Sequence, residues 1–289
     1  MPNCGVHRVT VLLVAPVVGF DATIAPTLFG SAADAGGAPL YEVTICAATA
    51  GAVPTTSGYS MLPGAGPQAL ATADTVVIPG TRYPPARTNG TLGPEVRAAL
   101  EMVRPGARLV SICTGAFVLA AAGLLDDRPA TTHWQFADTF RALFPSVRLD
   151  ENVLFVDDGD VLTSAGLAAG IDLCLHIIRS DHGAQAANEV ARHCVVPPWR
   201  EGGQAQFIDR QVPAADDAST AATREWALAH LDEHLTVQVL ARHAHMSART
   251  FNRRFRTETG EAPGHWIRNR RLDRARAAGI TARSEEHTS

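Results

Sequence analysis

The chain has 289 residues, enough for two domains that each bury a core. Its hydrophobic content of 46% and charged content of 19% exclude a disordered or fibrous protein. No apolar run approaches the roughly 20 residues that span a bilayer, and Val9–Pro16 is too short and wrongly flanked for a signal peptide. We therefore expect a cytoplasmic protein with no membrane partner.

The net charge of −4 hides an asymmetry between the two parts of the chain. Residues 1–223 hold 13 arginines against 21 acidic residues, whereas residues 224–282 hold 11 arginines against 6 acidic residues. An acidic body with a basic C-terminal unit predicts that only the second part contacts a polyanion.

Residues 7–195 alternate between strand-like and helix-like patterns. Short apolar or β-branched runs predict strands at Val9–Ala15, Tyr41–Ala47, Thr75–Pro79 and Arg108–Cys113. Segments rich in alanine and leucine predict helices at Ala22–Ala35, Leu92–Val103, Ala116–Ala122 and Trp134–Phe144. Strands that alternate with helices imply right-handed crossovers between parallel strands. The expected fold class is therefore α/β: a flavodoxin-like, mainly parallel sheet sandwiched by helices, followed by a small all-α helix-turn-helix domain.

The end of this first domain has its own signals. Asp158-Gly159 separates the strand-like runs Asn152–Asp157 and Asp160–Thr163, which predicts a hairpin. Helices are expected at Gly170–His182 and Ala184–His193, and Pro197-Pro198 ends the second of them. We expect a sensor domain over 7–196, a linker over 197–222 and a DNA-binding domain over 223–282.

Five cysteines are scattered along the chain without a CxxC pair, which argues against a disulfide framework or a metal site. We expect no cofactor. Cys113 alone has a special context, because the strand that it ends passes directly into a helix. A cysteine at such an elbow faces a pocket, where helix N-terminal amides stabilise a thiolate.

The segment Arg108–Phe117 resembles the nucleophile elbow of the class I glutamine amidotransferase-like superfamily, in its PfpI-like branch. The resemblance implies a ligand pocket, and the residues that it places there are Asp21, Gly80, Cys113, Thr114 and His133. Peptidase-like members have histidine directly after the nucleophile, where this chain has Thr114. We therefore expect a binding pocket with no catalytic residues, with His133 as the substitute base if an activity is retained.

Thr236–Gly260 has the pattern of two helices joined by a tight turn. Thr236 is the expected cap of the first helix and Ser247 that of the second. Phe251 and Phe255 form an apolar pair four residues apart, and forked donors line the opposite face. The residues expected to contact DNA are Ser247, Arg249, Thr250, Asn252, Arg253 and Arg256.

Arginine pairs with guanine and asparagine with adenine in the major groove, so we expect Arg249, Asn252 and Arg253 on base edges. Phosphates are the expected partners of Arg254, Arg268, Arg270 and Arg271. The alternative is an ordinary helix with a solvated basic face.

The residues from Leu240 to Ala275 are similar to the first helix-turn-helix of the AraC/XylS family. The similarity rests on Leu240-Ala241, the run Met246–Phe255, Thr259-Gly260, Pro263, Trp266, Arg271-Leu272 and Ala275. His245 stands where that family usually has glycine, so we expect a slightly strained turn. Together with the elbow at Cys113, the order of domains resembles GlxA-type AraC regulators.

Members of that family normally carry two helix-turn-helices joined by a long helix, for which Pro263–Ala278 is the candidate. Residues 283–289 read Arg-Ser-Glu-Glu-His-Thr-Ser, the translation of the common sequencing-adapter sequence AGATCGGAAGAGCACACGTCT. We expect that the reading frame runs into adapter near Arg283, so that this is a C-terminally truncated regulator with the first motif only. A natural polar tail is the alternative.

The expected function is a DNA-binding transcription regulator with a small-molecule-sensing domain, not an enzyme. Its expected partners are double-stranded DNA, an unknown small effector, a second copy of the chain in a homodimer, and RNA polymerase. One helix-turn-helix makes about half the phosphate contacts of two, so we expect weak, salt-sensitive binding. The alternatives are a PfpI-like cysteine hydrolase or amidase with a vestigial tail, and a sensor and dimerisation module that has lost DNA binding.

Overall fold

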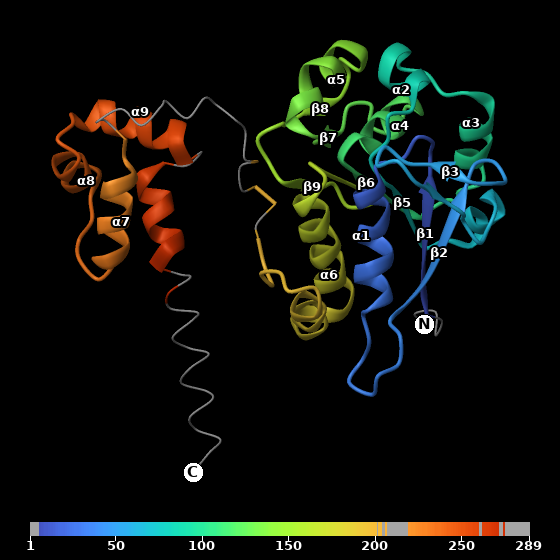
Figure 1. Cartoon of the computed structure of the whole chain (residues 1–289), viewed down its shortest axis with the longest axis horizontal. Coiled ribbons are helices and arrows are strands. Elements are labelled where there is room, and N and C mark those ends of the chain that lie inside the picture. The colour runs from blue at the N-terminus through green and yellow to red at the C-terminus, as the bar shows by residue number, and fades with distance from the viewer. Residues whose placement is uncertain are drawn as a thin grey trace. The chain divides into compact units, whose positions relative to one another are not determined.

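Figure 1 shows the computed structural model of the chain, which describes residues 6–200, 202–203, 206, 219–259, 262–271 and 274. The chain divides into two compact units, Met1–Gln206 and Phe207–Ser289. We call them the α/β unit and the helical unit and describe each by itself. Most of the expected linker over 197–222, and all of the tail over 283–289, lie outside the described residues.

A mainly parallel sheet forms the centre of the α/β unit. Its strands lie in the order β2-β1-β5-β6-β10-β9, with bounds Tyr41–Ala47, His7–Leu13, Thr75–Ile78, Arg108–Ile112, Val161–Ser164 and Phe155–Asp157. Neighbouring strands run parallel, except that β9 is antiparallel to β10. The side chains of β5 are buried throughout, as expected for a strand covered on both faces. The predicted α/β fold with a mainly parallel sheet is confirmed.

Helices cover both faces of this sheet. One hydrophobic cluster contains α1 (Gly19–Gly30) and α6 (Ala168–His193), with Phe29 fully buried in it. A second cluster joins the sheet to α2 (Pro84–Asn89), α3 (Pro94–Glu101), α4 (Ala116–Ala121) and α5 (Ala137–Leu143). The sequence did not predict α2, because its six residues begin with two prolines and are too few to show a helical period.

Two glycines with positive φ divide the last elements of the unit. Gly183 (φ 87°, ψ 173°) breaks α6 into two helical halves, which confirms the predicted boundary between Gly170–His182 and Ala184–His193. Gly159 (φ 83°) forms the turn between β9 and β10, so the predicted hairpin is confirmed. Both conformations favour glycine because it has no Cβ.

Short elements connect the larger ones. β3 (Val53–Pro54) and β4 (Ser60–Met61) form an antiparallel ribbon, and β7 (Pro129–Ala130) pairs with β8 (Arg148–Leu149) in parallel. Short 3₁₀-helices lie at Pro67–Thr72, Cys113–Gly115 and Trp134–Phe136. Within the described ranges, no helix combines the length and the apolar character that crossing a membrane requires.

The helical unit contains α7 (Ala221–Ala229), α8 (Val237–His243) and α9 (Ala248–Thr259), and residues 263–271 are also helical. Thr236 Oγ1 accepts a hydrogen bond from the Val239 amide at 3.2 Å, and Ser247 Oγ accepts one from the Thr250 amide at 3.1 Å. Both predicted helix caps are therefore confirmed. The core of the unit consists mainly of Leu240, Phe251, Phe255, Trp266 and Ile267.

We predict that Gly115→Ala destabilises the α/β unit. A Cβ at this position would lie 2.2 Å from the carbonyl oxygen of Ile78, which belongs to a central strand and cannot move aside. Overpacking of this kind costs about 1–3 kcal/mol or more of unfolding free energy, measured by urea denaturation. Gly30→Ala is the matched control, since nothing lies within 4 Å of its added Cβ, and a similar loss there would contradict the explanation.

Candidate functional site

Cys113 lies directly after β6, with a left-handed backbone (φ 56°). A residue other than glycine costs about 1–3 kcal/mol in such sparsely populated conformations, so the surroundings must hold it there. Thr132 provides part of that support, because its hydroxyl donates a 2.9 Å hydrogen bond to the Cys113 carbonyl. The side chain of Cys113 is buried, with 6% of the residue exposed.

Glycines allow the neighbouring loops to approach this elbow. A Cβ at Gly166 would lie 2.1 Å from the Cβ of Cys113, and a Cβ at Gly80 would lie 2.2 Å from Asp21 Oδ2 and 3.2 Å from the Cys113 Cβ. The structure therefore brings three of the predicted pocket residues together: Asp21, Gly80 and Cys113. Gly166 belongs to the same group, although the sequence analysis did not single it out.

Thr114 is buried and has a structural role. Its hydroxyl donates to the Thr81 carbonyl at 2.8 Å and accepts from the Thr81 amide at 2.9 Å. These two bonds tie the start of α4 to the loop that follows β5. A side chain so fully engaged does not supply the general base that a histidine would supply at this position.

Asp21 is fully buried on α1. Its Oδ1 accepts a hydrogen bond from the Leu167 amide at 3.1 Å, whereas Oδ2 is turned toward Gly80 and the Cys113 side chain. Burial raises the pKa of this carboxyl to about 6. Asp21 can therefore carry a proton at mildly acidic pH.

Burial also raises the pKa of the Cys113 thiol to about 12, and the nearby Asp21 charge acts in the same direction. The Thr114 amide and hydroxyl oppose this shift but are outweighed. The structure thus corrects the expectation of a stabilised thiolate, because desolvation dominates over the helix N-terminal amides. At neutral pH the site holds a thiol.

His133 lies at the edge of this group. Its ring stacks on Trp134 at 5.7 Å between centroids, and its Nδ1 accepts a hydrogen bond from the Gln135 amide at 3.2 Å. Burial lowers its pKa, which keeps the imidazole neutral at neutral pH. Among the described residues, none of its hydrogen bonds reaches Cys113 or Asp21, so the structure does not join His133 to the thiol as a base.

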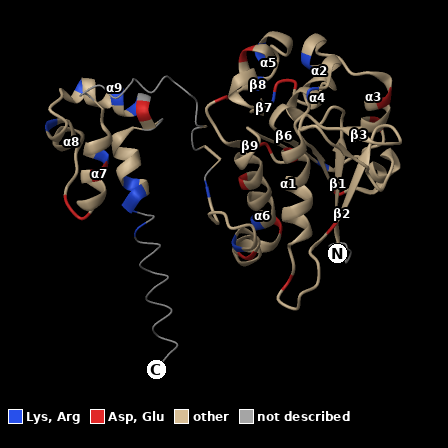
Figure 2. Ribbon diagram, viewed as in Figure 1, with Lys and Arg blue, Asp and Glu red and all other residues tan. Residues whose placement is uncertain are grey.

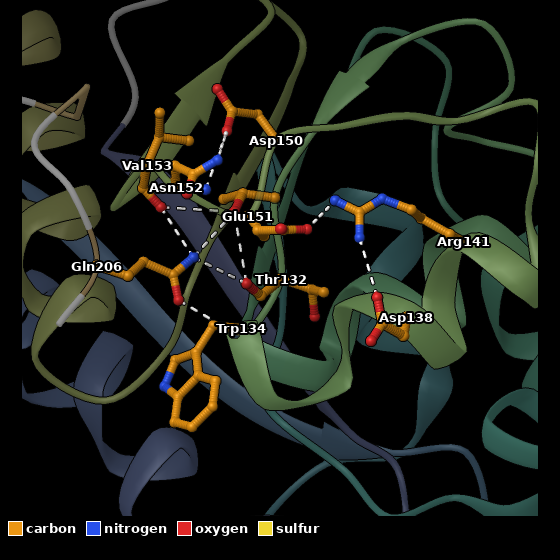
Figure 3. Close-up of polar contacts among 10 residues, drawn as sticks. Thr132, Trp134, Asp138, Arg141, Asp150, Glu151, Asn152, Val153 and Gln206 are labelled. Carbon is orange, nitrogen blue, oxygen red and sulfur yellow. Dashed lines mark hydrogen bonds and ion pairs between the residues drawn. The ribbon is translucent and has the colours of Figure 1, made fainter. Parts of the chain in front are cut away.

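Gln206 is a functional candidate that the sequence analysis missed. Figure 3 shows its side-chain amide inserted between two segments of the α/β unit. Nε2 donates at 3.0 Å to the carbonyls of Thr132 and Val153, and Oε1 accepts from the Trp134 amide at 3.1 Å. The same Thr132 holds the Cys113 carbonyl, so a chain of hydrogen bonds leads from the elbow to Gln206.

Other residues near Gln206 also bind the α/β unit. The guanidinium of Arg200 forms a bidentate pair with Asp172, and Arg179 lies 5.0 Å from the Trp199 ring centroid. The carbonyl of Gly202 accepts from the Leu154 amide at 2.7 Å, next to the edge strand β9. We call the described residues of 198–206 the strap. No local pattern in the sequence marks these contacts, because their partners are distant along the chain.

In the helical unit, Arg249, Arg253 and Arg256 are exposed on α9, as Figure 2 illustrates by colour for the arginines of this helix. Asn252 is only half-exposed, and its Oδ1 is buried without a hydrogen-bond partner in the described structure. Reading adenine requires both the oxygen and the nitrogen of the amide, so Asn252 must turn outward to do so. Ser247 and Thr250 bond to each other at the helix cap.

The structure also bears on the predictions for His245 and Arg271. His245 has φ 52°, which confirms a left-handed turn residue where glycine would cost less. Arg271 donates to the carbonyls of Leu231 (2.8 Å) and Glu233 (2.5 Å), so in this structure it binds the loop after α7 instead of being turned toward solvent for a phosphate.

Glu258 on α9 binds the start of α7. Its carboxylate accepts hydrogen bonds from the amide of Thr220 at 3.0 Å and from its hydroxyl at 2.6 Å, and Arg224 lies 3.4 Å away. The described part of this unit begins at residue 219. Its first described residues are therefore bound by α9, the helix that carries the exposed arginines.

Comparison with known families matches both units. Residues 21–180 match the DJ-1/PfpI family, and residues 240–285 match a helix-turn-helix domain. This pair of matches confirms the expected combination of a PfpI-like domain with a helix-turn-helix.

Curated relatives include regulators from Pseudomonas aeruginosa. The chain is 34% identical over 194 residues to the HTH-type transcriptional regulator ArgR, covering 66% of this chain and 57% of ArgR. It is 30% identical over 263 residues to the HTH-type transcriptional regulator CdhR, covering 90% of this chain and 76% of CdhR. The chain thus spans little more than half the length of ArgR.

The α/β unit is also similar to an enzyme. Isonitrile hydratase from Pseudomonas putida is 32% identical over 138 residues, covering 45% of this chain and 56% of the hydratase. Among solved structures, an AraC family transcriptional regulator from Pseudomonas putida has a TM-score of 0.54 at 21% identity, covering 65% of this chain and 99% of that one. That likeness shows the fold of the α/β unit.

We predict a pH-dependent effect of Asp21→Asn. Because the pKa of Asp21 is raised on folding from 3.8 to about 6, the folded state binds this proton more tightly than the unfolded state. The carboxyl therefore destabilises the fold only when ionised. The unfolding free energy of the wild type should fall relative to that of Asp21→Asn by about 2 kcal/mol between pH 4 and pH 7.

Urea denaturation at several pH values measures this difference, and comparison of the two proteins cancels the titration of all other groups. A difference that stays constant from pH 4 to pH 7 would show that Asp21 has an ordinary pKa in the folded protein.

Proposed function

Because the chain belongs to the DJ-1/PfpI family, we propose that its α/β unit senses a small molecule beside Cys113 and that its helical unit binds DNA, as in a transcription regulator. The similarity to ArgR and CdhR supports this function. The observation that carries the proposal is the pair of capped helices α8 and α9, with exposed arginines on the second. That arrangement fits a helix placed in the major groove.

We propose a binding site at Cys113 without turnover. A buried thiol with a pKa near 12 is almost entirely protonated at neutral pH, and the thiolate is the nucleophilic form. Thr114 is engaged with Thr81, and the hydrogen bonds of His133 lie elsewhere. The alternative is a cysteine-dependent hydratase, hydrolase or amidase, which the similarity to isonitrile hydratase and the protonatable Asp21 favour. Turnover that is lost in Cys113→Ala would establish it.

The remaining parts of the proposal concern partners. We propose that two copies of the chain act together on DNA in the cytoplasm, because helix-turn-helix proteins commonly bind paired half-sites as dimers. A contact with RNA polymerase is proposed for the same complex. The effector would change DNA binding only by favouring one of two arrangements of the protein over the other.

We propose that the strap carries this change. Thr132 contacts the Cys113 carbonyl through its hydroxyl and Gln206 through its carbonyl. A ligand that shifts the elbow therefore changes the hydrogen bonds of Gln206. At the far end of the connecting residues, Thr220 is held by Glu258 on α9. Release of Gln206 would detach the end of the strap from the segment that contains Thr132.

We predict that the double variant Arg249→Ala, Arg256→Ala weakens DNA binding and its dependence on salt. If both side chains contact phosphates, the slope of the logarithm of the DNA-binding constant against the logarithm of the salt concentration should fall in magnitude by about 2. If one of them contacts a base edge, the variant should also lose about 1–3 kcal/mol of discrimination between DNA sequences. Fluorescence anisotropy with duplex DNA at several salt concentrations measures both quantities.

The control for this experiment is Arg192→Ala, which removes an exposed arginine from α6 in the other unit and should leave both values unchanged. Equal binding by the wild type and the double variant at every salt concentration would contradict a DNA-reading role for α9.

We predict that Gln206→Met, which keeps the length of the side chain, destabilises the α/β unit and exposes Cys113. The buried carbonyls of Thr132 and Val153 would lose a donor, which costs about 1–3 kcal/mol of unfolding free energy. Because coupling between two sites is reciprocal, the Cys113 thiol should also react faster with iodoacetamide. Mass spectrometry of the Cys113 peptide measures the rate.

Gln185→Met is the control, since it replaces an exposed glutamine on α6. If Gln206→Met lowers the unfolding free energy but leaves the rate of the reaction of Cys113 with iodoacetamide unchanged, Gln206 anchors the strap without being coupled to the site.

A further inference from the structure

Arg87 on α2 is a half-buried cation at the edge of the candidate site. Its guanidinium carbon lies 4.1 Å from the ring centroid of Phe136 and 4.7 Å from that of Phe117. Nη1 donates a 3.3 Å hydrogen bond to the carbonyl of Thr81. The two aromatic rings and this bond fix the orientation of the guanidinium.

The position of Arg87 relative to Cys113 follows from the contacts of Thr81. The carbonyl of Thr81 accepts from both Arg87 and Thr114, and Thr114 directly follows Cys113. Gly80, the residue before Thr81, lies against the Cβ of Cys113. Phe136, which contacts Arg87, also lies 5.7 Å from the ring of His133. Arg87 is therefore linked to the elbow at Cys113 through the carbonyl of Thr81.

Arg87 lacks a counter-ion in the described part of the chain. Arg108, Arg128 and Arg200 of the α/β unit are half-buried and paired with Asp181, Asp160 and Asp172. Arg179 has no carboxylate partner among the described residues either, but its guanidinium donates to the Asn188 side chain and to the Pro198 carbonyl. No carboxylate among the described residues lies within 4.0 Å of Arg87, and its Nε is buried without a hydrogen-bond partner. A partly desolvated cation without an anion is costly, so the site favours an incoming negative charge.

The contacts of Arg87 also restrict the kind of anion. The rings of Phe117 and Phe136 lie against the guanidinium, and the Thr81 carbonyl takes one of its donors. Its buried Nε has no partner among the described residues, so an N–H donor is left for a planar carboxylate. One uncompensated cation balances one negative charge. A phosphate dianion fits less well, because the carboxyl of Asp21 also lies beside Gly80 and Cys113 and would repel two negative charges more strongly than one.

We propose that the small molecule bound beside Cys113 is a carboxylate and that Arg87 binds its carboxyl group. This inference rests on the proposed sensing function, whose site it shares, and it specifies the chemical class of the effector. The rest of the molecule would extend over the thiol of Cys113, toward His133 and Trp134. Arg87 is then the residue that selects charged over neutral ligands.

The test uses two alkylating reagents of nearly equal size, iodoacetate and iodoacetamide, on the full chain. In each reaction the Cys113 sulfur forms a bond to carbon, iodide leaves and the thiol proton passes to solvent. The ratio of the two rates at Cys113 is measured by mass spectrometry, with the half-buried Cys194 of the same molecules as internal reference. Arg87→Met should lower the iodoacetate-to-iodoacetamide ratio at Cys113 by about tenfold, since it removes a charge-assisted hydrogen bond.

Arg82→Met is the matched control, because it removes an exposed arginine five residues earlier and should change the ratio by less than about twofold. Arg87→Lys, which keeps the charge without the planar fork, should fall between the wild type and Arg87→Met. A ratio that is the same in the wild type and in Arg87→Met overturns the proposal.

If neither reagent labels Cys113, the same comparison is made by thermal unfolding with propionate and propionamide at constant ionic strength. Propionate should raise the Tm of the wild type but not that of Arg87→Met, and propionamide should raise neither. Equal effects of the two compounds on the wild type overturn the proposal. DNA titration of the unmodified wild type tests the regulatory function separately, so the failure of one inference leaves the other intact.

Discussion

The left-handed backbone of Cys113 is the constraint on which the arrangement of the site depends. Such a conformation persists only where the surroundings enforce it. Here Gly80 and Gly166 let two loops approach to distances that no Cβ would permit, and the Thr132 hydroxyl holds the Cys113 carbonyl. These loops follow different strands of one parallel sheet, so their ends meet at the same edge. The elbow therefore fixes Asp21, Thr114 and the Thr132 segment together.

Burial sets the chemistry of this group of residues. The thiol of Cys113 and the carboxyl of Asp21 are removed from water. Burial therefore favours the neutral form of each group over its charged form. Arg87 cannot lose its proton in the same way, and burial leaves it with an uncompensated positive charge. A protonated thiol beside a cation without a counter-ion among the described residues supports the binding function proposed for the site.

Features with local causes could be predicted from the sequence, and features with distant partners could not. Gly159 and Gly183 mark positions where the backbone requires glycine, and the caps at Thr236 and Ser247 depend on residues three positions away. The elbow at Cys113 was recognisable because a strand and a helix meet there. In contrast, Gln206 contacts residues more than 50 positions distant, and the missing partner of Arg87 depends on where every carboxylate lies in space. The high pKa of Cys113 was missed for a similar reason, because desolvation is a property of the packed fold.

The two ends of the connecting residues differ in what holds them. At the α/β unit, Gln206 forms neutral hydrogen bonds with the segment next to the elbow, within reach of any movement of Cys113. At the helical unit, the carboxylate of Glu258 binds the amide and hydroxyl of Thr220, and hydrogen bonds to a charged group are the stronger kind. If one end is to yield when a ligand binds, it is the end at Gln206. Ligand binding would then release the strap from the α/β unit, while the contact between Thr220 and α9 is kept.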